Sequence, residues 1–134
     1  MSLAVVILAA GEGTRMMSGL PKVLHPLGGR PLVLHALETA RQLTDHPPVL
    51  IVGHGREAVE DAVGEGVTMV EQAEQLGTGH AVLQARTVLR GRADLVLVSY
   101  ADMPLLTAET LGQLVQRQRA NRGPITMLSL MQDN

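Results

Sequence analysis

The sequence predicts an α/β protein of three layers, in which a mostly parallel, Rossmann-like sheet carries helices on both faces. Two observations support this prediction. Five short apolar runs rich in β-branched residues alternate with segments whose apolar residues recur every three or four positions. The apolar runs are nearly continuous, which is typical of strands covered by helices on both sides. Sheets of this kind bind ligands beyond the carboxyl ends of their strands.

Strands and helices are expected to alternate along the chain. The apolar runs that we expect to form strands lie at residues 3–8, 49–52, 67–70, 95–100 and 125–130. Helical spacing of apolar residues is found between them, at residues 32–43, 58–63, 81–89 and 111–115. Pro31 suits the first turn of the first helix, and Thr107 can cap the last one.

The composition restricts the possible partners. With 134 residues, 46% hydrophobic and 18% charged, the chain can form one globular domain. Tyr100 is the sole aromatic residue, so stacking of a base or sugar on rings is nearly excluded. Interspersed charges and a net charge of −2 argue against nucleic acid and against an anionic membrane as partners. The absence of cysteine and of a membrane-spanning apolar run leads us to expect a cytoplasmic protein.

A glycine-rich loop, L-A-A-G-E-G-T-R-M, follows the first expected strand. Its glycines let main-chain N–H groups approach an anion, and its arginine offers charge to phosphate oxygens, which suits a triphosphate. A simple strand-to-helix turn is the alternative. A dinucleotide fingerprint fails at Met16, and a Walker loop lacks its Gly-Lys-Ser/Thr triplet. The residues expected at the ligand-binding edge are Ala9, Ala10, Gly11, Glu12, Gly13, Thr14 and Arg15.

Lys22, in the segment L-P-K-V-L-H, offers a second positive charge. The preceding Pro21 sets an extended approach that can hold the ammonium group in one place. A solvated surface lysine is the alternative reading. The short separation of Lys22 from Gly11, Gly13 and Arg15 favours a shared phosphate cradle.

The segment E-Q-A-E-Q-L-G-T-G-H-A-V follows the third apolar run. Gln72 and Gln75 supply amide donors and acceptors, and Gly77 and Gly79 leave the backbone open beside Thr78. Paired donors and acceptors can distinguish one pyrimidine from another. The alternative is a polar loop in which Thr78 caps the next helix.

Asp102 follows the fourth apolar run, at the same edge as the glycine-rich loop. Mg²⁺ prefers one or two carboxylates together with substrate phosphates and water, so a single aspartate can be its protein ligand. Alternatively, Asp102 caps a turn before Pro104. The histidines show no metal-ligand spacing, and a structural role is favoured even for His54. Ser18 and Ser99 lack the His and Asp partners of a nucleophile.

These motifs resemble the family of bifunctional N-acetylglucosamine-1-phosphate uridyltransferases/glucosamine-1-phosphate acetyltransferases, over essentially the whole chain. The glycine-rich loop and the L-P-K segment are similar to those of sugar and molybdopterin nucleotidyltransferases in general. The combination of P-K-V-L-H-P-L-G-G-R-P-L, V-G-H-G and Q-A-E-Q-L-G-T-G-H-A resembles the uridyltransferase branch. The resemblance implies a nucleotide-diphospho-sugar transferase fold and a place in peptidoglycan precursor synthesis.

The resemblance also implies a reaction. A phosphate oxygen of N-acetylglucosamine-1-phosphate would attack the α-phosphorus of UTP, and Mg²⁺-pyrophosphate would leave. Alignment and charge neutralisation would then provide catalysis, with Arg15 and Lys22 holding phosphates and Asp102 binding the metal. The other residues implied by the resemblance are Leu8, Ala9, Ala10 and Gly11 for the nucleotide, Gln72, Gly77 and Thr78 for uracil, and Tyr100 and Ala101 for the sugar.

Two departures from the family qualify this expectation. Ala101 stands where the family usually has glycine, and its methyl is expected to crowd the sugar or the backbone. The family's nucleotidyltransferase domain continues for roughly another hundred residues, a size within ordinary domain lengths, and a β-helix acetyltransferase domain follows it. We therefore expect residues 1–134 to be the N-terminal part of that domain, inactive alone and self-associating through the run at 125–130. Two alternatives stay open: a nucleotidyltransferase for another base, sugar or molybdopterin, and a non-catalytic nucleotide-binding fragment.

Overall fold

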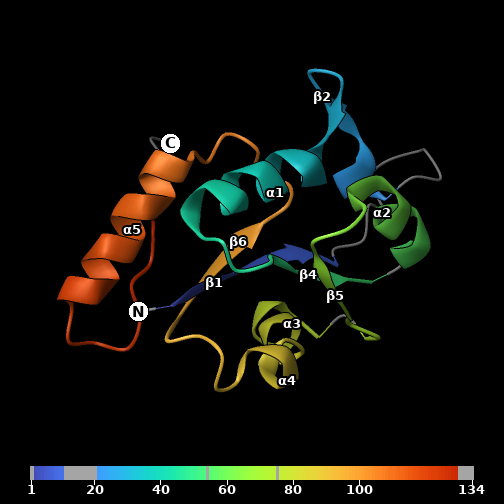
Figure 1. Ribbon diagram of the computed structural model, residues 1–134. Coiled ribbons are helices and arrows are strands. Elements are labelled where there is room, and N and C mark those ends of the chain that lie inside the picture. The colour runs from blue at the N-terminus through green and yellow to red at the C-terminus, as the bar shows by residue number, and fades with distance from the viewer. Residues whose placement is uncertain (1, 11–20, 54, 75, 130–134) are drawn as a thin grey trace, which may run out of the picture.

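The computed structural model describes residues 2–10, 21–53, 55–74 and 76–129, and these form the three layers that the sequence predicts. The central sheet has the strand order β5-β4-β1-β6, with parallel pairing throughout. Its strands are β1 (Leu3–Ala9), β4 (Val49–Val52), β5 (Thr68–Glu71) and β6 (Leu95–Tyr100). Figure 1 shows three helices on one face, α1 (Leu32–Leu43), α2 (Arg56–Val63) and α5 (Ala108–Ala120), and two on the other, α3 (Thr78–Leu83) and α4 (Arg86–Leu89).

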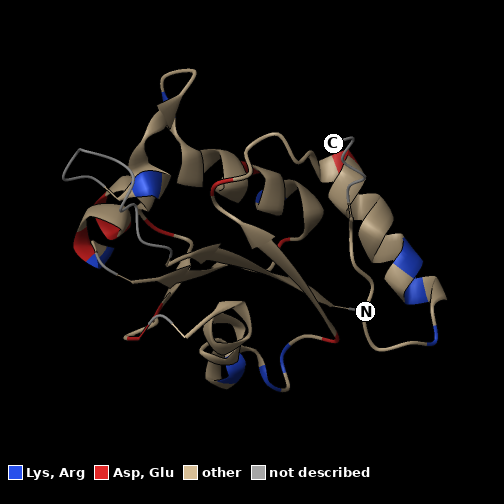
Figure 2. Cartoon of the chain, turned by 180° about the vertical axis from the view of Figure 1, so that it is seen from behind, with Lys and Arg blue, Asp and Glu red and all other residues tan. Residues whose placement is uncertain are grey.

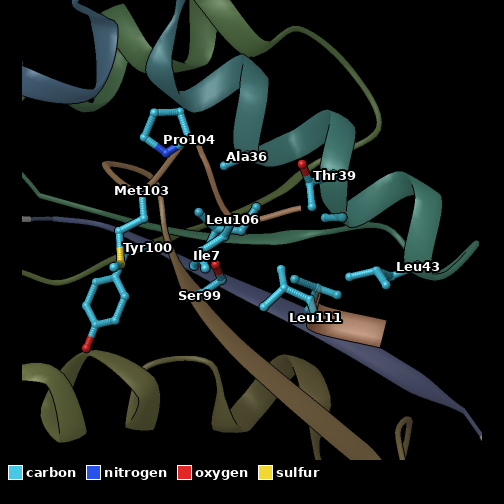
Figure 3. Close-up of a pocket in the computed structure, with 12 residues that line it drawn as sticks. Ile7, Ala36, Thr39, Leu43, Ser99, Tyr100, Met103, Pro104, Leu106 and Leu111 are labelled. Carbon is cyan, nitrogen blue, oxygen red and sulfur yellow. The ribbon is translucent and has the colours of Figure 1, made fainter. Parts of the chain in front are cut away.

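The strand β1 is buried along its whole length because its two faces meet two sets of helices. On one face, Val5 packs in the core that contains Leu37 of α1; on the other, Val6 packs in the core that contains Ala81 of α3. The near-continuous apolar run of the sequence is the consequence of this double burial. Figure 3 shows part of the core that contains Val5 and Leu37, between α1 and β6. Its labelled side chains include Ile7, Ala36, Leu106 and Leu111.

The chain connections place the ligand-binding edge next to β1. After β1 the chain passes through α1 to β4 on one side of β1, and after β5 it passes through α3 and α4 to β6 on the other side. The carboxyl ends of β1 and β6 therefore flank the point where the strand order reverses. Open α/β sheets bind ligands in the crevice at such a point.

Two local features differ from the sequence prediction. A hairpin of β2 (Pro26–Leu27) and β3 (Arg30–Pro31) precedes α1, and its turn consists of Gly28 and Gly29, whose φ values are 63° and 83°. Two adjacent glycines allow this two-residue turn. Pro31 consequently ends the hairpin and caps α1, which begins one residue later. The helix expected over residues 81–89 is divided into α3 and α4 by a turn at Gln84 and Ala85.

The last helix begins as predicted. Thr107 precedes α5, and its Oγ1 accepts a hydrogen bond of 3.1 Å from the backbone N–H of Thr110. This bond satisfies one of the N–H groups that have no partner within the first turn of a helix. None of the described helices is long and apolar enough to cross a membrane.

The prediction of a strand at residues 125–130 is wrong for the part of it that the structure describes. Residues 125–129 have no regular secondary structure, and Ile125 and Met127 are 70% and 80% exposed. An apolar, β-branched sequence forms a strand only where another strand pairs with it, because strand preference mainly reflects packing against neighbours. Among the described strands β6 instead forms this edge of the sheet, and its Val96 and Val98 are exposed while Leu97 is buried.

Candidate active site

A cleft of about 350 Å³ opens at the carboxyl ends of β1, β5 and β6. Its lining comes from four segments that are distant in the sequence. Predicted ligand-binding residues form most of this lining: Leu8, Ala9, Ala10, Lys22, Gln72, Gly77, Thr78, Tyr100 and Asp102. Val23 and Ala81 complete it and were not predicted, because an apolar residue by itself gives no indication that it also borders a ligand site.

Several predicted site residues lie outside the described residues, and their roles stay predictions. They are Gly11, Glu12, Gly13, Thr14 and Arg15 of the glycine-rich loop, together with Gln75. Among the described residues, Ala10 and Lys22, which precede and follow this stretch of the loop in the sequence, both line the cleft.

Backbone pairing extends one residue beyond β5 and β6 and so fixes the two sides of the cleft. The N–H of Gln72 donates to the carbonyl of Val52 at 2.7 Å, and the N–H of Ala101 donates to the carbonyl of Leu8 at 3.1 Å. Asp102 therefore follows immediately after the last paired residue. The Ala101 side chain is fully buried in the core and does not line the cleft, so the methyl expected to crowd a sugar packs inside the protein instead.

At one end of the cleft, Lys22 and Asp102 form an ion pair. Lys22 Nζ donates to Asp102 Oδ2 at 3.2 Å, and the two side chains are 46% and 39% exposed. Lys22 opens the short helix η1 (Lys22–Leu24), and Pro21 before it packs so closely on Gly55 that a Cβ at Gly55 would overlap the proline ring. Gly55 also has φ 80°, which favours glycine. Lys22 is thus both solvated and paired with Asp102, and the roles of the two side chains toward phosphate and metal stay predictions.

At the other end of the cleft, Gln72 belongs to a hydrogen-bonded network that, among the described residues, contains no carboxylate or ammonium group. Its side chain is only 3% exposed, and its Nε2 lies 3.4 Å from the carbonyl oxygen of Gly77 and 2.9 Å from Nδ1 of His80. Gly77, with φ 100°, is the N-cap residue of α3, and Thr78 is the first residue within the helix. The alternative of a helix cap at Thr78 is therefore not what the structure shows. Thr78 instead lines the cleft as the first residue of α3.

Tyr100 borders the cleft from β6. Its side chain is 40% exposed, and Figure 3 shows its ring directed away from Leu106 and Leu111, toward the face of the sheet that carries α3. Figure 2 shows basic and acidic residues interspersed over several elements. The negative charge of a bound phosphate would therefore have to be met by individual side chains such as Lys22.

A second hollow of about 520 Å³ lies beside the cleft, between the ends of β4 and β5, and contains Arg56. Arg56 is already paired with two carboxylates: Nε lies 2.8 Å from Glu60 and Nη1 lies 3.5 Å from Glu71. The hydrogen bond to Glu60 raises the pKa of the Arg56 guanidinium above its ordinary value. Because its charge is balanced in this way, Arg56 is a weaker candidate for phosphate binding than Lys22.

The sequence and the fold of the chain match a known class of protein. Residues 5–131 match the family described as the MobA-like NTP transferase domain, and the chain belongs to that family. The crystal structure of Rv0371c from Mycobacterium tuberculosis H37Rv has the same fold, with a TM-score of 0.77 and 26% identity over 89% of this chain and 61% of that one.

Within this class, the chain is similar to proteins named bifunctional protein GlmU. The protein from an Exiguobacterium species is 48% identical over 129 residues, which cover 96% of this chain and 29% of the relative. The protein from Cellvibrio japonicus is 57% identical over 114 residues, covering 84% and 25%. The chain thus spans less than a third of the length of these relatives. The resemblance that the motifs predicted is confirmed.

Proposed function

We propose that the cleft is a nucleotidyltransferase site that transfers UMP from UTP to N-acetylglucosamine-1-phosphate. The observation that carries the proposal is the convergence of nine predicted ligand-binding residues, from four separate segments, on one cleft. The similarity to proteins named bifunctional protein GlmU supports this choice of substrates. The absence of cysteine suits a reducing, cytoplasmic location.

The charged end of the cleft would align the two phosphate groups. A phosphate oxygen of the sugar 1-phosphate attacks the α-phosphorus of UTP, a new P–O bond forms, and the bond to the β-phosphate breaks to release pyrophosphate. The Lys22 ammonium would neutralise charge on phosphate oxygens, together with Arg15. No protein nucleophile is required, because correct alignment of the reacting groups supplies much of the rate acceleration.

The Asp102 carboxylate fits a magnesium ion. It is a hard oxygen donor, it is 39% exposed at the cleft, and Mg²⁺ needs only one or two carboxylates when substrate phosphates complete its coordination. Among the described residues, no group of three or more His, Cys, Asp or Glu could hold a metal alone, so phosphate oxygens would have to contribute. When bound, the ion would neutralise charge on the pyrophosphate leaving group.

The opposite end of the cleft would recognise the base. Gln72, Gly77 and Thr78 line it with an amide group and an open main chain. Such groups can hydrogen-bond the edge of a pyrimidine. The described cleft lining contains no ring other than that of Tyr100, so hydrogen bonds rather than stacking would provide selectivity.

Two measurements on the purified chain test the proposed function. Calorimetric titration with UTP, CTP, GTP and dTTP in magnesium buffer should show tightest binding of UTP. Pyrophosphate release from UTP and N-acetylglucosamine-1-phosphate then tests transfer; we expect little turnover from residues 1–134 alone and full turnover from a longer form. Tightest binding of another nucleotide would favour a nucleotidyltransferase for a different base, sugar or molybdopterin, which the MobA-like family assignment keeps as the second candidate.

We also propose that the chain self-associates through the outer face of β6. Val96, Val98 and Tyr100 are exposed there, and they line an apolar groove of about 540 Å³ together with residues 124–128. Exposed apolar strand edges pair readily with a second chain. Light scattering should give a mass above that of one chain, and Val98→Lys should reduce it to the monomer value.

A further inference from the structure

The histidine of α3 has no role in the proposed function, yet it holds the side chain of Gln72. His80 is half-buried behind Gln72, and its Nδ1 lies 2.9 Å from Gln72 Nε2. Gln72 lines the cleft, whereas His80 does not. A role of His80 toward a ligand would therefore be exerted through Gln72.

Hydrogen-bonding rules determine the orientation of the Gln72 amide. The carbonyl oxygen of Gly77, 3.4 Å from the Gln72 amide group, can only accept a hydrogen bond, so the NH₂ group must face it. The second N–H of the same group is then directed to Nδ1 of His80. Nδ1 must consequently carry the lone pair, and the proton of the neutral ring is on Nε2.

The other nitrogen of the His80 ring, Nε2, also has an amide neighbour, and this neighbour decides which nitrogen carries the proton. Nε2 of Gln84 lies 3.3 Å from Nε2 of His80 and 3.1 Å from the His80 carbonyl oxygen. A neutral imidazole accepts at one nitrogen only, so the amides of Gln72 and Gln84 cannot both donate to the ring. Gln84 can keep its bond to the carbonyl oxygen, whereas a reversed Gln72 amide would lose its bond to Gly77. The network therefore favours the proton on Nε2.

We infer that His80 is a positioning residue that fixes Gln72 with its Oε1 available as a hydrogen-bond acceptor for the base. Both N–H bonds of the Gln72 amide are directed to protein acceptors, and no described residue donates to Oε1. Oε1 can accept from the ring N3–H of a uracil, whereas a cytosine carries a lone pair at that position. This inference rests on the proposed function, in which Gln72 contacts the base, and it assigns base selectivity to the tautomer of His80.

The experiment compares UTP and CTP affinities of three variants by calorimetry at pH 8, where free imidazole is neutral. His80→Leu removes the acceptor and should reduce the preference for UTP over CTP by about tenfold, because the Gln72 amide can then reverse. His80→Asn, whose amide oxygen can replace Nδ1 as acceptor, should restore part of the preference. Gln84→Leu is the matched control: it removes the other side-chain neighbour of the ring and should leave the preference unchanged.

The outcomes separate this inference from the proposed function. If the unmodified protein does not prefer UTP, both fail. If it prefers UTP and His80→Leu keeps that preference, or lowers both affinities by the same factor, His80 has only a structural role. A readout independent of the variants is the ring tautomer, measured by ¹⁵N NMR of the unmodified protein: we expect the proton on Nε2, and a proton on Nδ1 would overturn the inference even if His80→Leu does not fold.

Discussion

The two ends of the cleft hold their side chains by opposite means. At the charged end, Lys22 and Asp102 are paired at 3.2 Å while both remain more than a third exposed. At the opposite end, which we propose recognises the base and call the base end, Gln72 is 3% exposed. Its amide is hydrogen-bonded to the main-chain carbonyl of Gly77 and to the imidazole of His80. Lys22 and Asp102 can therefore exchange each other for a ligand, whereas the hydrogen bonds of Gln72 hold its side chain in one geometry.

Energetics explain this difference. An exposed ion pair contributes about 0–1 kcal/mol to stability, so phosphate oxygens and a cation can replace its two members at little cost. A buried amide that loses its partners costs about 1–3 kcal/mol, which keeps the base end fixed before a ligand arrives. Within this cleft, the structure thus combines an adaptable pair of charged side chains with a fixed, hydrogen-bonded amide.

The largest effect is expected from Arg15→Ala, which removes a predicted phosphate-binding residue outside the described part of the chain. Loss of one preorganised donor to a developing charge should reduce turnover by about a hundredfold or more. Pyrophosphate release should be measured in a form of the protein that turns over UTP. The control is Arg92→Ala, which removes the same charge near the amino end of β6 and should leave turnover nearly unchanged. Near-normal kinetics of Arg15→Ala would remove this residue from the mechanism.

Gln72→Leu tests whether the base end is preformed. We expect a loss of about 1–3 kcal/mol in the free energy of unfolding, because the Gly77 carbonyl and the His80 ring lose a buried partner. Urea denaturation measures this loss, and Gln42→Leu, at an exposed position of α1, provides the comparison. Equal stability of the two variants would mean that the base end is no more rigid than the surface.

Asp102→Asn tests the exchange of partners at the charged end. Without the carboxylate, magnesium should enhance UTP affinity severalfold less than it does in the unmodified protein, since an amide is a poorer ligand for a hard cation. Titrations with UTP, in the presence and absence of magnesium, give the ratio of the two affinities directly. Asp61→Asn, an exposed position of α2, should retain the full enhancement. The metal assignment is wrong if Asp102→Asn retains it too.

The smallest effect is expected on folding when the ion pair itself is removed. Lys22→Met should change the free energy of unfolding by less than about 1 kcal/mol, similar to Arg30→Met in the exposed pair with Glu38. Urea denaturation of the two variants provides the comparison. A loss of several kcal/mol at Lys22 alone would show that the charged end is structural, and the contrast between the two ends would then fail.

The differences between prediction and structure have two origins. The runs at residues 3–8 and 95–100 became β1 and β6, whereas the run at 125–129, in which Thr126 and Ser129 interrupt the apolar residues, remained irregular. Composition and periodicity indicate how a segment would pack, but not whether a neighbouring strand is available to pair with it. The hairpin before α1 was missed although Gly28 and Gly29 indicate a tight turn, because its strands are only two residues long.

The sequence by itself determined the parallel α/β order and most of the cleft lining, because continuous apolar runs and the residues that follow them are local features. Tertiary structure alone decided the pairing of Lys22 with Asp102, which are 80 residues apart, and the burial of Ala101 in the core. It also decided that His80, for which the sequence indicates no separate role, binds Gln72. These contacts depend on how separate segments meet in space, and spacing along one chain does not specify that.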